Sequence, residues 1–314
     1  MSSRIAFVSQ LAPDEEAPWL GALRAAMPGE AIAALREIPP GARAAVDIAV
    51  VANPSPDELG QLPGLRWIHS VWAGVERLVG NPAVTRLPLV RLVDPELSRT
   101  MAEAVLAWTY YLFRDMPAYA AQQRQRLWRQ LPCRRPGETT IGLLGLGELG
   151  TAAAERLRHA GFRVVGWSRS EKRVAGIETA SGEDGLRSVL GAADILVCLL
   201  PLTPQTRGLL DGEAFGRMRA GAALINFGRG PIVVRDDLIA ALDRGPLTHA
   251  VLDVFDTEPL PASDPYWDHP KVTVLPHISA PTNMETAAGI VAQNIARYRE
   301  TGTLPPTVDL ARGY

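Results

Sequence analysis

The sequence predicts an α/β protein in which the short strands of parallel sheets alternate with helices. Three observations support this prediction. The chain has 314 residues, enough for about two domains of ordinary size. Short apolar, β-rich runs alternate along it with longer patterns of helical period. A glycine-rich turn lies directly between one of these runs and a helix, which is where βα units turn.

Composition and charge exclude several classes of protein. Hydrophobic residues make up 47% of the chain and charged residues 21%, close to the globular average, so disordered and fibrous classes are excluded. Acidic residues outnumber basic ones by 34 to 32, so the chain has no general attraction for nucleic acid, and we expect no nucleic-acid partner.

The apolar runs and the cysteines indicate the compartment. No apolar run approaches the roughly 18 residues that a membrane helix needs. The N-terminal segment MSSRIAFVSQLAPDEE has an apolar part too short for a signal peptide. Cys133 and Cys198 are not spaced as a metal site or a redox pair. We therefore expect a reduced, cytoplasmic protein with no bound metal and no membrane partner.

The first third of the chain contains strand-like runs bounded by Gly, Pro, Asn or Asp. They cover residues 4–9, 46–52, 65–71 and 89–93. A helix predicted over 101–113 has apolar residues around much of its circumference, which is typical of a helix buried between domains or subunits. A polar helix is expected over 118–128, followed by a loop over 131–137.

A second series of six strands follows. They are near-continuous apolar runs, as expected for strands covered on both faces, and lie at 140–144, 163–167, 195–199, 222–227, 250–255 and 272–275. Six such strands with helices between them are typical of a doubly wound, nucleotide-binding domain. A last helix over 283–301 has few local partners, so we expect it to return to the N-terminal domain.

The glycine turn has the pattern G-x-G-x-x-G in the required context, after the strand TIGLL and before a helix that opens at Leu149. Gly145 permits the tight turn, Gly147 lets the backbone approach a pyrophosphate, and Gly150 lets the helix pack close to the strand. Free N–H groups at the helix start would then bind the phosphates. Glu148 is tolerable there only if its carboxylate points to solvent.

The residues at the end of the next strand indicate whether the cofactor is NAD or NADP. NAD enzymes usually carry an acid there to bind the ribose hydroxyls, but this sequence has Ser168, followed by Arg169, Ser170 and Lys172. A serine with neighbouring cations suits a 2′-phosphate. We therefore expect a preference for NADP(H), with NAD(H) as the weaker cofactor; the alternative is a solvated basic loop.

Three polar residues follow three successive strands at the edge where such sheets bind ligands. These are Arg229, Glu258 and His277. Singly, they also fit a surface cation, a loop carboxylate and a structural imidazole, but together they suit hydride transfer to a ketone. His277 would donate the proton, Glu258 would orient the ring and raise its pKa, and Arg229 would bind a substrate carboxylate.

These motifs resemble the D-isomer-specific 2-hydroxyacid dehydrogenase family, and within it the reductases of glyoxylate and hydroxypyruvate. The matching segments are GLGELG at 145–150, GWSRS at 166–170, LLPLTPQT at 199–206, NFGRG at 226–230, LDVFDTEPLP at 252–261 and LPHISAPT at 275–282. The resemblance implies NADPH-dependent reduction of a small 2-oxoacid, glyoxylate or hydroxypyruvate. The alternatives are a family member with a different 2-oxoacid and a nucleotide-sensing protein that is not an enzyme.

The resemblance also implies further site residues. The loop after residue 71 would hold the substrate carboxylate through the N–H groups of Ala73 and Gly74, and Trp72 would narrow the pocket unless it is a core aromatic. The resemblance adds four cofactor contacts, at Pro201, Thr206, Phe227 and Asp253.

Finally, the resemblance implies an architecture. It consists of two doubly wound parallel-sheet, Rossmann-like domains with the active-site cleft between them. Residues 1–97 with 285–314 would form a flavodoxin-like substrate-binding domain, and residues 98–284 the dinucleotide-binding domain. A homodimer would form through the dinucleotide-binding domains, using the helix at 101–113, and Trp128 would reach across it.

Overall fold

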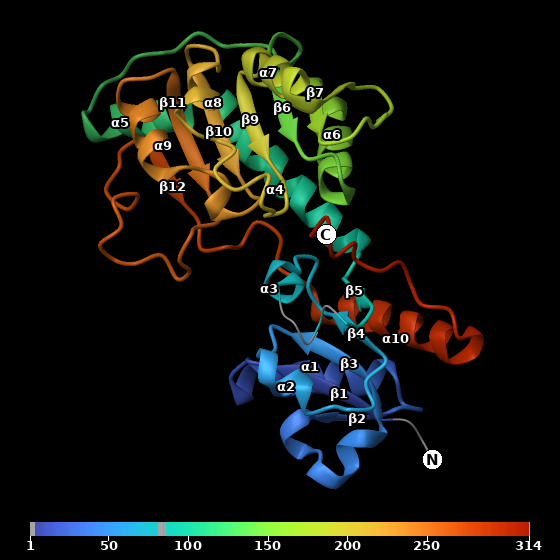
Figure 1. Ribbon diagram of the computed structural model, residues 1–314. Coiled ribbons are helices and arrows are strands. Elements are labelled where there is room, and N and C mark those ends of the chain that lie inside the picture. Colours follow the sequence, from blue (N-terminus) through green and yellow to red (C-terminus); the bar gives the residue numbers. More distant parts are fainter. Residues whose placement is uncertain (1–3, 81–83, 85, 314) are drawn as a thin grey trace. The chain divides into compact units, whose positions relative to one another are not determined.

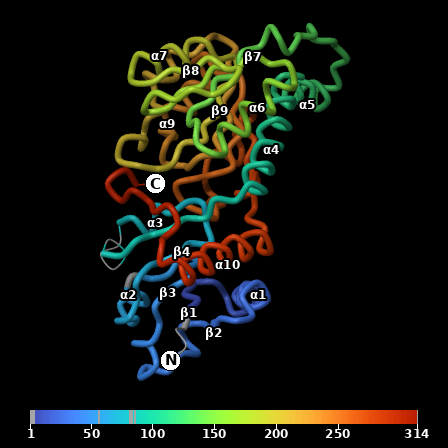
Figure 2. The backbone as a smooth tube through the Cα atoms, turned by 90° about the vertical axis from the view of Figure 1, so that its right-hand side faces the viewer, coloured from blue at the N-terminus to red at the C-terminus, as the bar shows by residue number. Residues whose placement is uncertain are grey.

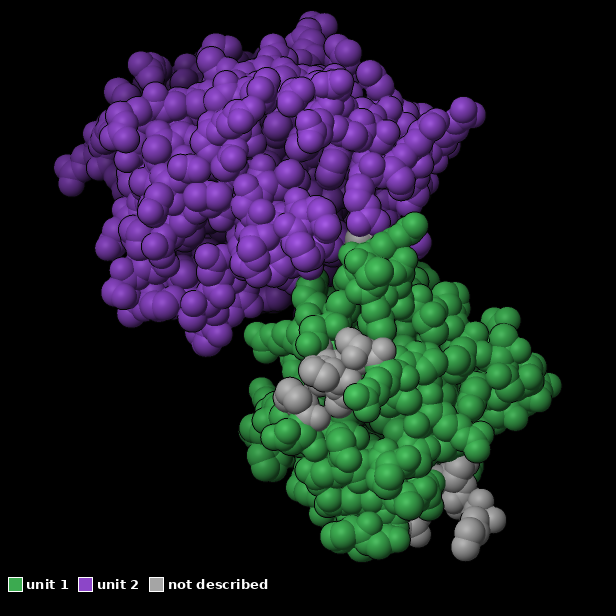
Figure 3. Space-filling model, viewed as in Figure 1, with its two compact units in different colours: residues 1–96, 282–314 green, residues 97–281 purple. Residues whose placement is uncertain are grey.

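The computed structural model describes residues 4–80, 84 and 86–313. The chain divides into two compact units, Met1–Glu96 with Thr282–Tyr314 and Leu97–Pro281, coloured separately in Figure 3. Each unit is built on a parallel sheet with helices around it (Figure 1). The prediction of two α/β, parallel-sheet domains is confirmed.

Unit 1 contains a five-stranded sheet in the order β2-β1-β3-β4-β5, among the residues described. This is the order of flavodoxin-like sheets. The strands are β1 (Arg4–Ser9), β2 (Ala31–Ala34), β3 (Val46–Ala52), β4 (Trp67–Ser70) and β5 (Leu89–Val90). Strand β2 was not predicted, because three of its four residues are alanine, which has little preference for strands.

Helices cover both faces of this sheet. They are α1 (Pro13–Ala26), α2 (Pro56–Gly60), α3 (Glu76–Val79) and α10 (Met284–Thr301), with short 3-10 turns at Leu35–Glu37 and Pro40–Ala45. The C-terminal helix α10 lies beside α1 (Figure 2), and Val291 and Ile295 share a buried cluster with Trp19 and Leu23. The last helix of the chain therefore completes the N-terminal unit.

Unit 2 contains a seven-stranded sheet, within the described residues, in the order β12-β11-β10-β9-β6-β7-β8. This is the doubly wound order, which reverses between β9 and β6. The strands are β6 (Thr140–Leu144), β7 (Arg163–Ser168), β8 (Glu178–Ser181), β9 (Ile195–Cys198), β10 (Ala222–Asn226), β11 (Leu247–Leu252) and β12 (Val272–Val274). The six predicted strands are present, but the edge strand β8 was missed because its sequence ETAS is polar and partly exposed.

The helices of unit 2 form two layers. Apolar side chains of α4 (Pro95–Phe113) and α6 (Glu148–His159) pack on one face of the sheet. Those of α7 (Gly182–Ala192), α8 (Gly212–Gly216) and α9 (Arg235–Asp243) pack on the other. The buried stripe of α4 thus covers its own sheet. Among the described residues, no helix combines the length and the hydropathy needed to cross a membrane.

The polar helix α5 (Met116–Arg124) is shorter than predicted. The prediction that it extends to residue 128 is wrong, because Arg126 adopts a left-handed conformation with φ 55°, which ends a helix. The chain beyond it is irregular up to the short turn Pro136–Glu138, and Trp128 is 96% exposed there.

Candidate active site

The glycine turn has the geometry of a phosphate site. Gly145 has φ 101°, and a Cβ on Gly150 would lie 1.8 Å from the Gly145 carbonyl oxygen, so the turn and the first turn of α6 touch through backbone. A Cβ on Gly147 would meet nothing within 4 Å, so the space in front of the turn is open. Glu148 is exposed and Leu149 is partly buried at the start of α6. The turn and the helix start therefore fit a pyrophosphate.

The loop after β7 folds back on the glycine turn. Lys172 donates its ammonium to the carbonyl oxygen of Leu146, inside the turn. Ser168 donates its hydroxyl to the carbonyl oxygen of Ser170 at 2.8 Å, which fixes the loop at the strand end. Arg169 follows Ser168 and is exposed. Of the two predicted cations, Lys172 therefore contacts the glycine turn, and Arg169 lies exposed in the same loop.

A second loop lies beyond the strand β9. Thr206 donates its hydroxyl to the Pro201 carbonyl oxygen at 2.7 Å and accepts the N–H of Thr203 at 2.8 Å. This hydroxyl therefore fixes the path of the loop. Phe227 is buried at the end of β10, and its N–H donates to the carbonyl oxygen of Cys198 at 3.0 Å.

The predicted pair of His277 and Glu258 is in contact. Nδ1 of His277 lies 2.8 Å from Oε2 of Glu258. A carboxylate accepts only, so Nδ1 carries the proton. Oε1 of the same carboxylate accepts the N–H of Phe255 at 2.9 Å. The carboxylate is thus held from both sides, and it fixes the plane of the imidazole.

The pair is tuned electrostatically toward a charged imidazole. The hydrogen bond to Glu258 raises the pKa of His277, against partial burial and the charge of Arg229. Burial alone would raise the pKa of Glu258, but hydrogen bonds from His277 and Phe255, helped by the charges of His277 and Arg229, lower it. The arrangement therefore favours imidazolium beside carboxylate, the form that can donate a proton.

Arg229 follows β10 and is partly buried. Its Nη1 donates to the carbonyl oxygen of Gly228 at 2.7 Å. Its positive charge acts on both His277 and Glu258, so the three predicted side chains share one electrostatic environment.

Asp253 supports the loop that carries His277. It is buried at the end of β11, with 2% of its surface exposed. Its Oδ1 accepts the N–H of Ile278 at 2.8 Å, and its Oδ2 accepts the N–H of Ser279 at 2.9 Å. His277 itself has φ 55°, a left-handed conformation that a non-glycine residue keeps only when its surroundings hold it. The Asp253 carboxylate supplies that hold.

The predicted substrate loop lies in unit 1, after β4. Its Trp72 packs edge-to-face on Trp19, with ring centroids 5.4 Å apart, and adjoins the unit's buried core. The N–H of Trp72 donates to Ser70 Oγ at 3.0 Å, which fixes the start of the loop. Ala73 and Gly74 follow in the loop and are partly buried.

Three backbone N–H groups that hold the carboxylates of the site could not be predicted from the sequence. The N–H groups of Phe255, Ile278 and Ser279 hold the two carboxylates of the site, yet their side chains carry no signal of this role. Across residues 4–80, 84 and 86–313, no group of three or more His, Cys, Asp or Glu side chains is placed to hold a metal ion.

Comparisons with known proteins place the sequence in one family. Residues 106–279 match the NAD binding domain of the D-isomer specific 2-hydroxyacid dehydrogenases. The glyoxylate/hydroxypyruvate reductase A of Yersinia enterocolitica is 37% identical over 307 residues, which span 96% of this chain and 97% of that protein.

Solved structures are similar over the full length. A D-isomer specific 2-hydroxyacid dehydrogenase from Xanthobacter autotrophicus Py2, in complex with NADPH and MES, has a TM-score of 0.93 and 36% identity, covering 100% of both chains. An NADPH-dependent glyoxylate/hydroxypyruvate reductase from Sinorhizobium meliloti, in complex with NADP and sulfate, has a TM-score of 0.91 and 35% identity, again covering 100% of both chains.

Proposed function

Because this chain belongs to the D-isomer specific 2-hydroxyacid dehydrogenase family, we propose that it reduces glyoxylate or hydroxypyruvate to the 2-hydroxyacid with NADPH. The observation that carries the proposal is the 2.8 Å contact between His277 and Glu258 in the unit that holds the phosphate turn. A proton donor and a dinucleotide site on one sheet edge are what carbonyl reduction requires.

The chain's own residues would manage charge and protons. When bound, NADPH supplies a hydride to the carbonyl carbon of the substrate, which leaves negative charge on the carbonyl oxygen. His277 donates its Nε2 proton to that oxygen, which yields the hydroxyl group, and the neutral ring regains a proton from solvent. Glu258 stabilises the imidazolium before the transfer, and Arg229 binds the substrate carboxylate through its guanidinium fork.

The cofactor assignment rests on the loop after β7. We expect Ser168, Arg169, Ser170 and Lys172 to bind the 2′-phosphate, and the glycine turn to bind the pyrophosphate. The contact of Lys172 with the turn supports this, as does the NADP in the structure of the Sinorhizobium meliloti relative. NAD(H) would bind more weakly, because it lacks the group that these cations recognise.

The remaining assignments stay predictions of the proposal. We expect Phe227 and Asp253 to contact the nicotinamide carboxamide, and Pro201 and Thr206 to line the cofactor. The N–H groups of Ala73 and Gly74, beside Trp72, are expected to bind the substrate carboxylate. The packing of Trp72 on Trp19 also fits the alternative, a core aromatic.

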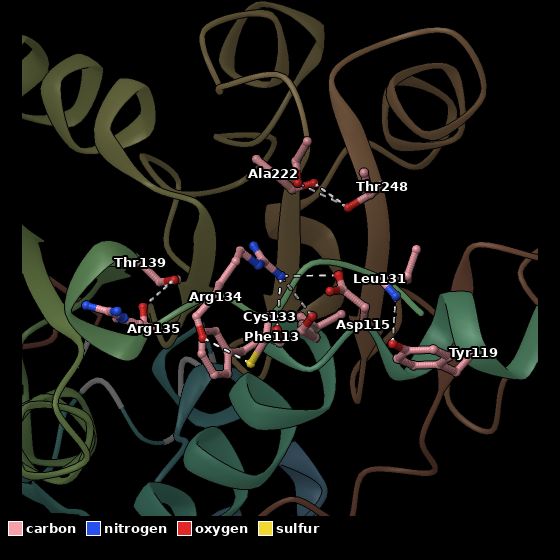
Figure 4. Close-up of polar contacts among 12 residues, drawn as sticks. Phe113, Asp115, Tyr119, Leu131, Cys133, Arg134, Arg135, Thr139, Ala222 and Thr248 are labelled. Atoms are coloured by element: carbon pink, nitrogen blue, oxygen red, sulfur yellow. Dashed lines mark hydrogen bonds and ion pairs between the residues drawn. The ribbon is translucent and has the colours of Figure 1, made fainter. Parts of the chain in front are cut away.

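We also propose a homodimer formed through unit 2. Trp128 is 96% exposed and Leu127 46% exposed, so two large apolar side chains lie next to each other on the surface of this unit. The segment behind them is anchored: Figure 4 shows Arg134 turned toward Phe113 and Asp115, to which it donates at 3.1 and 3.2 Å. A second copy of the chain would cover the exposed apolar side chains, and a Leu127→Glu/Trp128→Glu double variant should then sediment as a monomer.

A substrate panel tests the proposed activity. Purified protein is mixed with NADPH or NADH and with glyoxylate, hydroxypyruvate, pyruvate or a larger 2-oxoacid, and absorbance at about 340 nm is followed. We expect the highest kcat/KM with NADPH and either glyoxylate or hydroxypyruvate. Faster turnover of a larger acid would favour a different family activity, and no turnover with any acid would favour a nucleotide-sensing role.

A further inference from the structure

A buried asparagine lies beside the loop that carries Arg229. Asn226 ends strand β10, with 1% of its surface exposed. Its Nδ2 donates to the carbonyl oxygen of Arg229 at 3.1 Å, and its Oδ1 accepts the N–H of Gly228 at 3.2 Å. One amide therefore holds the two peptide groups that flank the Gly228–Arg229 peptide unit.

The peptide unit between these two contacts is in turn bonded to the arginine side chain. Nη1 of Arg229 donates to the carbonyl oxygen of Gly228 at 2.7 Å. The chain of contacts runs from the Asn226 amide to the Gly228–Arg229 backbone, and from that backbone to the guanidinium. An amide suits this position because it offers a donor and an acceptor on one rigid plane, which no carboxylate or hydroxyl does.

Hydrogen bonds as well as packing hold this loop. A cavity of about 100 Å³ lies against it, bordered among others by Asn226, Gly230 and Phe255. Backbone that faces a cavity can shift unless hydrogen bonds hold it. We propose that Asn226 is a positioning residue, which sets the Arg229 guanidinium for the substrate carboxylate. The claim that Asn226 positions the guanidinium is based on these contacts. The claim that this position affects substrate binding rests on the proposed function.

The test compares Asn226→Ala and Asn226→Leu with wild type. Losing two buried hydrogen bonds should raise KM for glyoxylate by about 5- to 100-fold. The Kd for NADPH should change less than about twofold, because neither variant removes a residue that the proposed function assigns to the cofactor. Asp211→Ala is the control: it removes the N-cap of α8, where Oδ1 accepts the Ala214 N–H at 2.9 Å, and should lower stability with KM unchanged.

A crystal structure of Asn226→Ala gives a readout that does not depend on the substrate. We expect Nη1 of Arg229 to leave the Gly228 carbonyl oxygen while the Glu258–His277 contact remains. An unmoved guanidinium, or losses of NADPH and glyoxylate affinity of equal size, would overturn the proposal. If wild type fails to reduce any 2-oxoacid, the proposed function fails, and the crystal structure still decides the role of Asn226.

Discussion

Nδ1 of His277 donates to Oε2 of Glu258 across 2.8 Å, so Nε2 is the ring nitrogen that the proposed reaction would use to exchange a proton with the substrate. The contact raises the pKa of His277 and helps to lower the pKa of Glu258. Reduction needs the imidazolium, so activity should persist below the raised pKa of His277 and be lost as the pH rises through it.

Glu258→Gln should therefore shift this loss to lower pH. The amide cannot stabilise the imidazolium by charge, so the pKa of His277 falls, and kcat/KM at neutral pH should drop about 10- to 100-fold. The measurement is the pH dependence of kcat/KM for glyoxylate between about pH 5 and 9. Asp256→Asn, at an exposed carboxylate nearby, is the control. A profile in Glu258→Gln that overlays wild type would refute the role of the carboxylate.

Asp253→Asn should damage both stability and turnover. The amide can accept only one of the N–H groups of Ile278 and Ser279, and its NH2 would face the other, leaving a buried donor unpaired. We expect the free energy of unfolding to fall by about 1–3 kcal/mol and kcat to fall about 10- to 100-fold as His277 loses its position. Asp184→Asn, at a fully exposed carboxylate, should change both little. Wild-type kcat in Asp253→Asn would show that the loop keeps its shape without the charge.

Two glycines of the phosphate turn should behave differently. Gly150→Ala places a Cβ 1.8 Å from the Gly145 carbonyl oxygen, so it should lower the melting temperature by about 5 °C or more. Gly147→Ala places its Cβ in open space, so it should melt like wild type yet bind NADPH at least about tenfold more weakly. Differential scanning fluorimetry and NADPH fluorescence titration give the two quantities. Tight NADPH binding by a well-folded Gly147→Ala would place the pyrophosphate elsewhere.

Arg169→Ala should reduce cofactor discrimination. Removing a guanidinium beside the 2′-phosphate costs NADPH a charge-assisted contact that NADH never makes. We expect the ratio of kcat/KM with NADPH to that with NADH to fall about 10- to 100-fold. Arg163→Ala, at the opposite end of β7, should leave the ratio unchanged. An unaltered ratio in Arg169→Ala would support the alternative, in which this loop is a solvated basic surface that does not bind the 2′-phosphate.

Much of the fold could be predicted because buried strands appear in the sequence as runs of apolar residues. The strands β1, β3 and β6 have the predicted bounds. The edge strands β2 and β8 could not be predicted, since partly exposed edges need no apolar run, and their sequences AIAA and ETAS give little signal. The end of α5 was missed because it depends on the left-handed backbone at Arg126.

The candidate site also has parts that could be predicted from the sequence and parts that could not. Glu258 and His277 could be predicted to meet because each follows a strand of one parallel sheet, whose carboxyl ends share an edge. The double hold of Asp253 on the next two peptide N–H groups could not, because it depends on the path of a loop rather than on residue type. The contact of Lys172 with the Leu146 carbonyl likewise joins segments 26 residues apart.

The most direct test of the account is His277→Ala, assayed with glyoxylate and NADPH. Without the imidazole no group of the pair donates the proton, so kcat should fall at least about 100-fold, while the Kd for NADPH stays within about twofold of wild type. A variant that binds NADPH normally and keeps kcat within about tenfold of wild type would contradict the assignment of His277 as the proton donor.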